Sequence, residues 1–410
     1  MTNANRTKPE LLAPAGGWEQ LEYAIRFGAD AVYLACDKFG MRARACNFSL
    51  EEMPRVVEYA HERGVDVHVT CNIIMHDGDM AELERYMAAL AEASVDAFII
   101  GDLGALRIAR RVAPSVAIHV STQASVSNAE AALTCYELGA RRIVCARELS
   151  LEDIAAMHTK LPEDLELEAF VHGAMCMAYS GRCLISDYTT GRSALRGSCA
   201  QSCRWNYALV EEKRPGEYFP IEEDGNGSYL LNAQDMNMLA HLDELAAAGV
   251  DSVKIEGRNK KAYYVASVVN AYRQVLDGAD PNAMLPELET VSHRPYSTGF
   301  YFGPAHQTHA SIDYIRQWEW AAEVLSCDPC ENGYRCRLRC RNRFELEATM
   351  EVISPHRPIR PVVLSDMSFV GVREDELPFA TDVANRTNED YEAISDIELV
   401  PHDIIRVKRG

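Results

Sequence analysis

Short apolar runs alternate with amphipathic segments along residues 10–257. The runs are rich in Val, Ile and Leu with little alternation, which is typical of strands buried on both faces. We predict strands at Glu10–Ala15, Ala31–Cys36, Asp66–Ile74, Ala97–Asp102, Ala117–Ser121, Arg142–Ala146, Leu167–His172 and Ser252–Glu256. The predicted helices are Trp18–Phe27, Leu50–Arg63, Met80–Ala93, Ala105–Val112, Ala129–Leu138 and Leu151–Leu161. Eight strands alternating with helices predict an α/β fold, a TIM-like (β/α)8 barrel. An open doubly wound sheet is the alternative, but no G-x-G-x-x-G follows the first strand.

The alternating pattern changes in two later regions. Residues 205–235 hold three short runs that predict a small inserted sheet, Tyr207–Glu212, Glu217–Ile221 and Ser228–Asn232, and a helix is expected over Asp235–Ala247. Residues 291–318 are rich in aromatic and turn residues, and we expect them to link the barrel (1–290) to a second domain (319–410). The second domain is predicted to be a small all-β barrel, with strands at Trp320–Cys327, Gly333–Phe344, Glu347–Ile353, Arg360–Leu364 and Ile404–Lys408.

Composition narrows the class of protein. The 410 residues are 48% hydrophobic and 25% charged, which is ordinary for a soluble globular chain. No apolar run approaches the roughly 18 residues of a membrane span, and the N-terminal segment lacks the apolar core of a signal peptide. Thirteen cysteines without an export signal indicate a reducing compartment, so we expect a cytoplasmic protein with no membrane partner. The net charge of −20 disfavours nucleic acid overall but does not describe local patches.

Four cysteines are concentrated in 28 residues, with the spacing C-x6-C-x15-C-x3-C: Cys176, Cys183, Cys199 and Cys203. Four thiolates are what a [4Fe–4S] cluster requires. Zinc is the alternative, although its sites usually show two close cysteine pairs, and unliganded buried thiols are a third interpretation. Because the segment follows the seventh predicted strand, we expect it to lie over the C-terminal end of the barrel, where TIM-barrel active sites form.

A second cysteine set lies in the C-terminal domain: Cys327, Cys330, Cys336 and Cys340. Cys336 and Cys340 fall on one predicted strand, where a regular backbone separates them by about 13 Å. Two ligands of one ion cannot be that far apart, so we predict no metal site here.

Polar residues also follow the predicted barrel strands at their C-terminal ends. The catalytic candidates among them are His172, Glu256 and Lys254, since a histidine and a carboxylate can move protons. The alternative is structural: polar residues at strand ends cap helices, and a buried Glu256 paired with Lys254 or Arg258 stabilises a fold.

Arginine occupies every second position of the predicted strand Gly333–Phe344, five times in succession: Arg335, Arg337, Arg339, Arg341 and Arg343. Period two places them on one face, about 6.6–6.8 Å apart, which is close to the phosphate spacing of an extended single strand. Five neighbouring guanidinium groups repel one another unless anions lie opposite them. We expect contact with an RNA backbone, and a ladder of ion pairs to carboxylates on a neighbouring strand is the alternative.

Several segments resemble the U32 family, long labelled peptidases, and specifically its tRNA-hydroxylation branch. They are AFVHGAMCMAYSGRC, GSCAQSCRW, EEKRPGEYFP, SVKIEGR and HRPYSTGFYFG. The resemblance implies that Cys176, Cys183, Cys199 and Cys203 ligate a [4Fe–4S] cluster. It also implies hydroxylation of the wobble uridine of tRNA to 5-hydroxyuridine, with prephenate as a participant. The segment FGMRARACNFS, around Cys46, differs from the common form and affects no predicted ligand.

The implied reaction is chemically consistent with this chain. No side chain hydroxylates a uridine carbon, so a redox centre is needed. A dicarboxylate such as prephenate needs cationic clamps, for which Arg147, Arg192, Arg258 and Lys254 are candidates.

Two other functions compete with an iron–sulfur RNA hydroxylase. The family label suggests a peptidase, but the chain has no H-E-x-x-H and no G-x-S-x-G. A non-catalytic iron–sulfur or RNA-binding accessory protein is the third hypothesis, and a charged pocket at the barrel mouth would favour catalysis over it.

Overall fold

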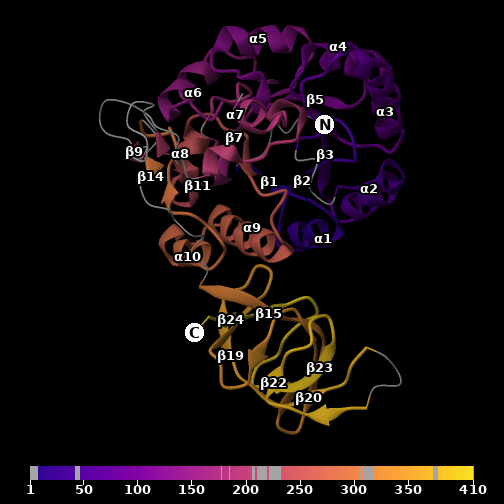
Figure 1. The fold of residues 1–410 in the computed structure, drawn as a ribbon, viewed down its shortest axis with the longest axis vertical. Helices are drawn as coiled ribbons and strands as arrows, with labels where there is room; N and C mark the ends of the chain where they lie inside the picture. The colour runs from indigo at the N-terminus through magenta and orange to yellow at the C-terminus, as the bar shows by residue number, and fades with distance from the viewer. Residues whose placement is uncertain are drawn as a thin grey trace.

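The computed structural model describes residues 8–41, 47–176, 178–183, 185–205, 208–209, 219–220, 232–303, 307–308, 315, 317–372 and 377–409. Within them the chain forms a barrel ringed by helices and, below it in Figure 1, a unit of antiparallel strands.

Eight parallel strands close into a barrel in sequence order, because the last one, β12, pairs with both β7 and β1. They are β1 (Glu10–Pro14), β2 (Ala31–Leu34), β3 (Asp66–Cys71), β4 (Ala97–Ile100), β5 (Ala117–Val120), β6 (Arg142–Val144), β7 (Glu166–Ala174) and β12 (Ser252–Ile255). Each predicted strand is present, so the TIM-like barrel is confirmed.

Helices cover the outside of the barrel (Figure 1). They are α1 (Trp18–Arg26), α2 (Met53–His61), α3 (Met80–Glu92), α4 (Leu103–Val112), α5 (Ala129–Glu137), α6 (Leu151–His158), α8 (Leu242–Ala247), α9 (Ala262–Leu276) and α10 (Pro281–Leu288), with α7 (Ile185–Thr190) inside the cysteine segment. Short 3₁₀ turns are η1 (Leu50–Glu52), η2 (Asp77–Asp79), η3 (Thr122–Ala124), η4 (Ala194–Arg196), η5 (Ser202–Arg204) and η6 (Leu239–His241). Asp102, Asn128 and Ser150 start α4, α5 and α6, because their side chains accept first-turn N–H groups.

The barrel interior is more polar than the apolar strand sequences suggest. Buried polar side chains include Glu10, His68, His119, Arg142 and Glu168. Because side chains two positions apart share a face, these strands also place Thr70, Ser121, Val144 and Phe170 inside, one layer nearer the C-terminal end. The apolar residues at the intervening positions pack against the helices and form the main core.

One predicted helix is wrong at its start. Residues Asp235–Asn237 form a strand, β11, that runs antiparallel to the end of β7, and the helix begins only at Leu242. β13 (Tyr296–Ser297), from the predicted linker, pairs with β11. Asp235 is also held by a buried ion pair with Arg294, whose Nη2 lies 2.7 Å from Oδ1. This long-range pairing overrides the local helical pattern.

The inserted sheet expected over 205–235 lies mostly outside the described residues. Within them, β8 (Ala208–Leu209) pairs antiparallel with β9 (Phe219–Pro220), and β10 (Asn232–Ala233) pairs with β14 (Gln307–Thr308). No helix in the described part of the chain has the length and apolar character needed to cross a bilayer.

The C-terminal part is all-β, as predicted. Its eight-stranded sheet has the order β19-β18-β24-β15-β16-β23-β20-β21, and β17 pairs with β22. The strands are β15 (Trp318–Cys330), β16 (Gly333–Cys340), β17 (Phe344–Glu345), β18 (Met350–Ile353), β19 (Arg360–Val362), β20 (Leu364–Phe369), β21 (Phe379–Ala380), β22 (Val383–Ala384), β23 (Asp390–Ser395) and β24 (Ile404–Lys408). The sequence did not predict β23, which pairs with the arginine-rich strand β16.

The two parts share a packed interface. Arg406 is buried, and its Nη1 donates to Glu287 on α10 at 2.6 Å and to Thr290 at 3.1 Å. Trp320 lies edge-to-face on Tyr23 of α1, with ring centroids 5.4 Å apart. The arginine strand is therefore fixed relative to the barrel.

Candidate active site at the barrel mouth

A cavity of about 140 Å³ lies at the C-terminal ends of the barrel strands. Inward-facing strand residues form its floor, and the loops after the strands form its walls. The lining residues that matter below are Tyr33, Thr70, Asn72, Gln123, Arg147, Glu148, Phe170, Ser180, Lys254, Glu256 and Arg258, together with the four clustered cysteines. The volume exceeds that of a single water, so the cavity admits a small ligand.

All four cysteines of the 176–203 segment line this one cavity: Cys176, Cys183, Cys199 and Cys203. Cys176 is exposed and the other three are half-buried, with none in a disulfide. Four thiolates around one zinc ion would have sulfurs about 3.8 Å apart. Within the described residues, no three cysteine sulfurs lie within 4.8 Å of one another. The described thiol sulfurs are thus not spaced like the ligands of a single tetrahedral ion.

The first half of the cysteine segment is anchored to the loops after β5 and β6. The Ser180 N–H donates to Glu148 at 2.8 Å, and its hydroxyl donates to the same carboxylate at 2.9 Å. Gly181 has φ +69°, and a Cβ there would lie 2.0 Å from the Gln123 carbonyl oxygen. Only glycine permits this approach, which fixes the chain between Cys176 and Cys183.

The second half is anchored to the loop after β3. The Ile74 N–H donates to the Leu195 carbonyl at 2.9 Å, and Arg196 donates to Asp79 at the same distance. Nearer the ligand candidates, Arg192 donates to the Cys199 carbonyl at 3.2 Å, and the Gln201 N–H donates to Cys199 Sγ at 3.3 Å. Hydrogen bonds to sulfur are among the features that set the potential of iron–sulfur clusters.

Three of the four predicted cationic clamps line the cavity: Arg147, Arg258 and Lys254. Arg147 stacks on Phe170 at 3.9 Å and donates to the Ala174 carbonyl at 3.1 Å and to Glu256 at 3.3 Å. Its Nε is buried and has no hydrogen-bond partner among the residues that the structure describes. Arg258 is buried and donates to Thr70 at 3.0 Å. Arg192 is not among the residues that line the cavity, and its contact is with the cysteine backbone.

The catalytic candidates on the eighth strand divide into two environments. Glu256 lines the cavity, with its carboxylate beside Arg147. Lys254 also borders the cavity, but its ammonium group is buried 2.7 Å from Glu168 and lies 4.5 Å from the Tyr33 ring centroid. The structural alternative paired Glu256 with Lys254 or Arg258, whereas here Lys254 pairs with Glu168 and Glu256 pairs with Arg147.

His172 lies apart from the cavity. It is buried where β7 meets β11, among the rings of Tyr264, Tyr272 and Tyr296. Burial lowers the pKa of His172 to about 3, and its Nε2 has no hydrogen-bond partner. The imidazole is therefore neutral near pH 7, and His172 is not among the residues that line the cysteine cavity.

The five arginines of the alternating row all have carboxylates nearby. Arg337 and Arg339 share Asp390 on β23, at 2.9 and 3.0 Å, and Arg335 lies 3.9 Å from Glu392. Beyond the end of β16, the last two leave the strand alternation: Arg341 contacts Glu19 and Glu323, and Arg343 contacts Glu345. This is the ladder of ion pairs that the sequence left as the alternative, and the ends of the row, Arg335 and Arg343, remain about two-thirds exposed.

Some lining residues carry no sequence signal. Tyr33, Thr70 and Phe170 sit within buried strands, where aromatic and β-branched residues are common. Period two shows which residues of a strand share a face. Which of the two faces points into the barrel is decided only when the barrel closes. Ser180 would be equally hard to single out from sequence, since it is one polar residue in a loop.

Sequence comparisons identify the family to which the chain belongs. The profile described as "Peptidase family U32" matches residues 16–311. A Bacillus subtilis protein named "tRNA hydroxylation protein P1" is 38% identical over 359 residues, covering 85% of this chain and 84% of its own length. An Escherichia coli protein named "23S rRNA 5-hydroxycytidine C2501 synthase" is 41% identical over 268 residues, 65% of this chain and 39% of that one. A Porphyromonas gingivalis protein named "Collagenase" is 34% identical over 312 residues, 72% of this chain and 73% of that one.

Proposed function

The chain belongs to peptidase family U32, and we propose that it hydroxylates the wobble uridine of tRNA to 5-hydroxyuridine, using a [4Fe–4S] cluster and prephenate. The observation that carries this proposal is that Cys176, Cys183, Cys199 and Cys203 line one cavity at the barrel mouth. The names of two relatives, one for tRNA and one for rRNA, support hydroxylation of an RNA base as the reaction class.

The four cysteines would hold the cluster, since they supply one thiolate for each iron. When bound, the cluster would supply the electron-transfer chemistry that amino-acid side chains lack. The chain's own contribution is to fix the loop: Glu148 holds Ser180, and Arg192 holds the Cys199 carbonyl. A loop fixed at both halves keeps the sulfurs on the cavity rim.

Arg147 and Arg258 are the groups best placed to bind a dicarboxylate. Both line the cavity, and the buried Nε of Arg147 has no hydrogen-bond partner. An unsatisfied buried donor is costly, so an acceptor that reaches it gains binding free energy. Glu256 accepts a hydrogen bond from Nη2 of the same guanidinium at 3.3 Å and would orient it.

Exposed aromatic residues surround the cysteine segment and suit an unstacked RNA base. Tyr179, Tyr188 and Trp205 are 54%, 93% and 48% exposed. Bases of single-stranded loops stack on such rings, and an anticodon loop presents unstacked bases. We therefore place the tRNA over this segment, with the target base directed into the cavity.

Peptidase activity, suggested by the family name and by the collagenase relative, is the second candidate. A cysteine peptidase needs a base within hydrogen-bond reach of its nucleophile. No histidine is among the described residues that line the cavity, and Glu148 and Glu256 are engaged with Ser180 and Arg147. The site therefore favours hydroxylation over peptide cleavage.

The test is complementation of a deletion strain, with nucleosides of its tRNA measured by mass spectrometry. The wild-type gene should restore 5-hydroxyuridine, and Cys199→Ala should not. Cys135→Ala is the matched control because Cys135 is buried on α5, away from the cavity. Anaerobically purified wild-type and Cys135→Ala proteins should absorb broadly near 400 nm, roughly where iron–sulfur proteins do, and Cys199→Ala should be colourless. Full restoration of 5-hydroxyuridine by Cys199→Ala would refute the proposal.

A further inference from the structure

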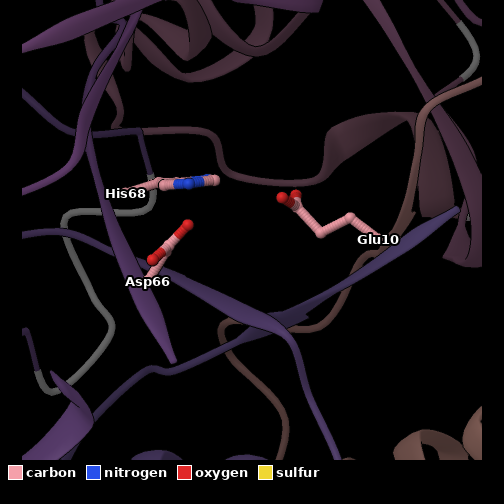
Figure 2. Close-up of side chains that lie close together, drawn as sticks. All are labelled: Glu10, Asp66 and His68. Carbon is pink, nitrogen blue, oxygen red and sulfur yellow. The ribbon is translucent and has the colours of Figure 1, made fainter. Parts of the chain in front are cut away.

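A group of potential metal ligands lies at the opposite, N-terminal end of the barrel. We propose that Glu10, Asp66 and His68 bind one divalent cation of the Mn²⁺ or Zn²⁺ class, joining β1 to β3 (Figure 2). One ligand atom from each residue lies within 4.8 Å of the other two. Figure 2 shows the imidazole of His68 with both carboxylates facing it. This site is separate from the cysteine cavity and plays no part in the hydroxylation proposed above.

The histidines give an independent reason to expect a ligand. His68 is 2% exposed, and its buried Nδ1 has no hydrogen-bond partner within the described part of the chain. The ring of His119, on β5, lies edge-to-face to the His68 ring, with centroids 4.7 Å apart. Nδ1 of His119 is also buried without a hydrogen-bond partner among the described residues. Buried polar atoms are almost always satisfied by protein, water or an ion. Two adjacent exceptions therefore point to something polar bound beside them.

Neighbouring groups already orient Glu10. Arg142 donates to its two oxygens at 2.6 and 3.0 Å, and the Ser252 hydroxyl donates to Oε1 at 2.9 Å. Metal-binding carboxylates are commonly held by hydrogen bonds of this kind. Glu10 is thus prevented from turning away from His68.

The charge balance also favours a divalent cation. The cavity at this end is lined by five carboxylates and three guanidinium groups, which belong to Glu10, Asp66, Asp96, Asp164, Glu166, Arg110, Arg141 and Arg142. Their formal charges sum to minus two, which one divalent ion would neutralise. The same cavity, which opens at this end, is lined by Glu10, Asp66 and His68, so an ion has a route to them.

The ligand types restrict the ion. Ligands about 2.1 Å from one ion lie at most about 4.2 Å apart, so binding would draw the three groups slightly together. One imidazole with two carboxylates suits Mn²⁺ or Zn²⁺ better than Ca²⁺, which takes oxygen ligands alone. Because β1 and β3 both flank β2, the ion would tie together three neighbouring strands at the end of the barrel where stability, not catalysis, is expected to reside.

The experiment uses MnCl₂ as the probe, because thiolates bind Mn²⁺ poorly and the cysteine segment will not compete. The full-length protein is treated with chelator, and free Mn²⁺ is counted by electron paramagnetic resonance during titration. Wild type should bind one Mn²⁺ per chain, and saturating Mn²⁺ should raise its Tm. Asp66→Asn and His68→Gln should each weaken binding by at least about tenfold.

Asp164→Asn is the matched control. Asp164 lines the same cavity but bonds to Tyr136, so its substitution removes an equal charge without removing a ligand. The control should bind Mn²⁺ like wild type. Absence of saturable binding in wild type would overturn the proposal. Equal weakening in all three variants would also overturn it, since general negative potential would then explain the binding. If either Asp66→Asn or His68→Gln fails to melt cooperatively, Mn²⁺ binding by the other variant still tests the proposal.

Discussion

Charged side chains fill both ends of the barrel interior, but their partners differ. At the N-terminal end, Arg142 is enclosed by Glu10, Glu166 and Glu168 at 2.6–3.2 Å, with 3% of its side chain exposed. At the mouth, Arg147 has one carboxylate, one carbonyl and a buried Nε without a partner. An arginine whose donors are all paired stabilises the barrel, whereas a buried donor without a partner is available to a ligand. The comparison teaches that burial alone does not mark a functional cation; incomplete hydrogen bonding does.

The largest expected effect tests Arg142, whose donors are all paired. Arg142→Met should lower the free energy of unfolding by about 3–5 kcal/mol, because it leaves buried carboxylates without their counter-charge. Arg343→Met is the matched control, since that arginine is 65% exposed and an exposed ion pair contributes about 0–1 kcal/mol. Chemical denaturation measures both. Equal losses would show that burial of the network does not determine its contribution.

The second effect concerns His172, a buried and uncharged imidazole near the end of β7. Burial lowers the pKa of His172 from 6.5 to about 3. Between these values the unfolded chain binds a proton that the folded chain does not, so stability is complete above pH 6.5 and is lost as the pH falls. The slope from this residue is about 1.4 kcal/mol per pH unit. His172→Phe should remove that contribution in unfolding experiments from pH 7 to pH 4.5.

Tyr272→Phe is the control for His172→Phe. It removes a hydroxyl that bonds to Val171 and contacts His172, but no group that titrates in this range. It should lower stability by a similar amount at every pH. An unchanged pH slope in His172→Phe would mean that this histidine is not the group that titrates on unfolding.

The third effect tests Arg147, at the barrel mouth. Arg147→Lys keeps the charge but loses the planar group that joins Phe170, Ala174 and Glu256. The initial rate of 5-hydroxyuridine formation should fall by at least about tenfold, or about 1.4 kcal/mol in barrier, with a smaller change in unfolding free energy. Arg141→Lys, at an exposed position over Tyr136, should leave the rate unchanged. A normal rate in Arg147→Lys would remove this residue from the proposed site.

The smallest effect concerns the C-terminal arginines, which are paired but exposed. Replacing Arg335 and Arg343 together by Gln should weaken tRNA binding by less than about tenfold if both contact phosphates. It should also reduce the slope of log Kd against log salt by about 1.4–1.8, from about 0.7–0.9 per contact. Arg107→Gln, on the exposed face of α4, is the control. An unchanged affinity and an unchanged salt slope would mean that these arginines form intramolecular ion pairs and do not contact tRNA.

Local sequence patterns predicted the elements well because strand and helix periodicities depend on neighbouring residues. The eight barrel strands were found to within a few residues, and so was the position of the cysteine segment after β7. Patterns failed where a distant partner decides the conformation. Asp235 begins a strand because β7 and Arg294 hold it, and neither is near it in the chain.

The same limit applies to side-chain roles. Alternation showed that the arginines of β16 share a face, but Asp390, which two of them share, lies about fifty residues away on a strand that no pattern marked. His172 was a reasonable candidate by its position before the cysteines. Its neighbours, Tyr264, Tyr272 and Tyr296, come from later elements and enclose it.

The sequence by itself determined the fold class, the cysteine spacing and the end of the barrel at which the cysteines would lie, since each depends on residue order alone. Only the tertiary structure decided which charged groups are satisfied and which are not. That distinction depends on atoms brought together from different strands, as with Glu10, Asp66 and His68 at one end and Arg147 and Glu256 at the other.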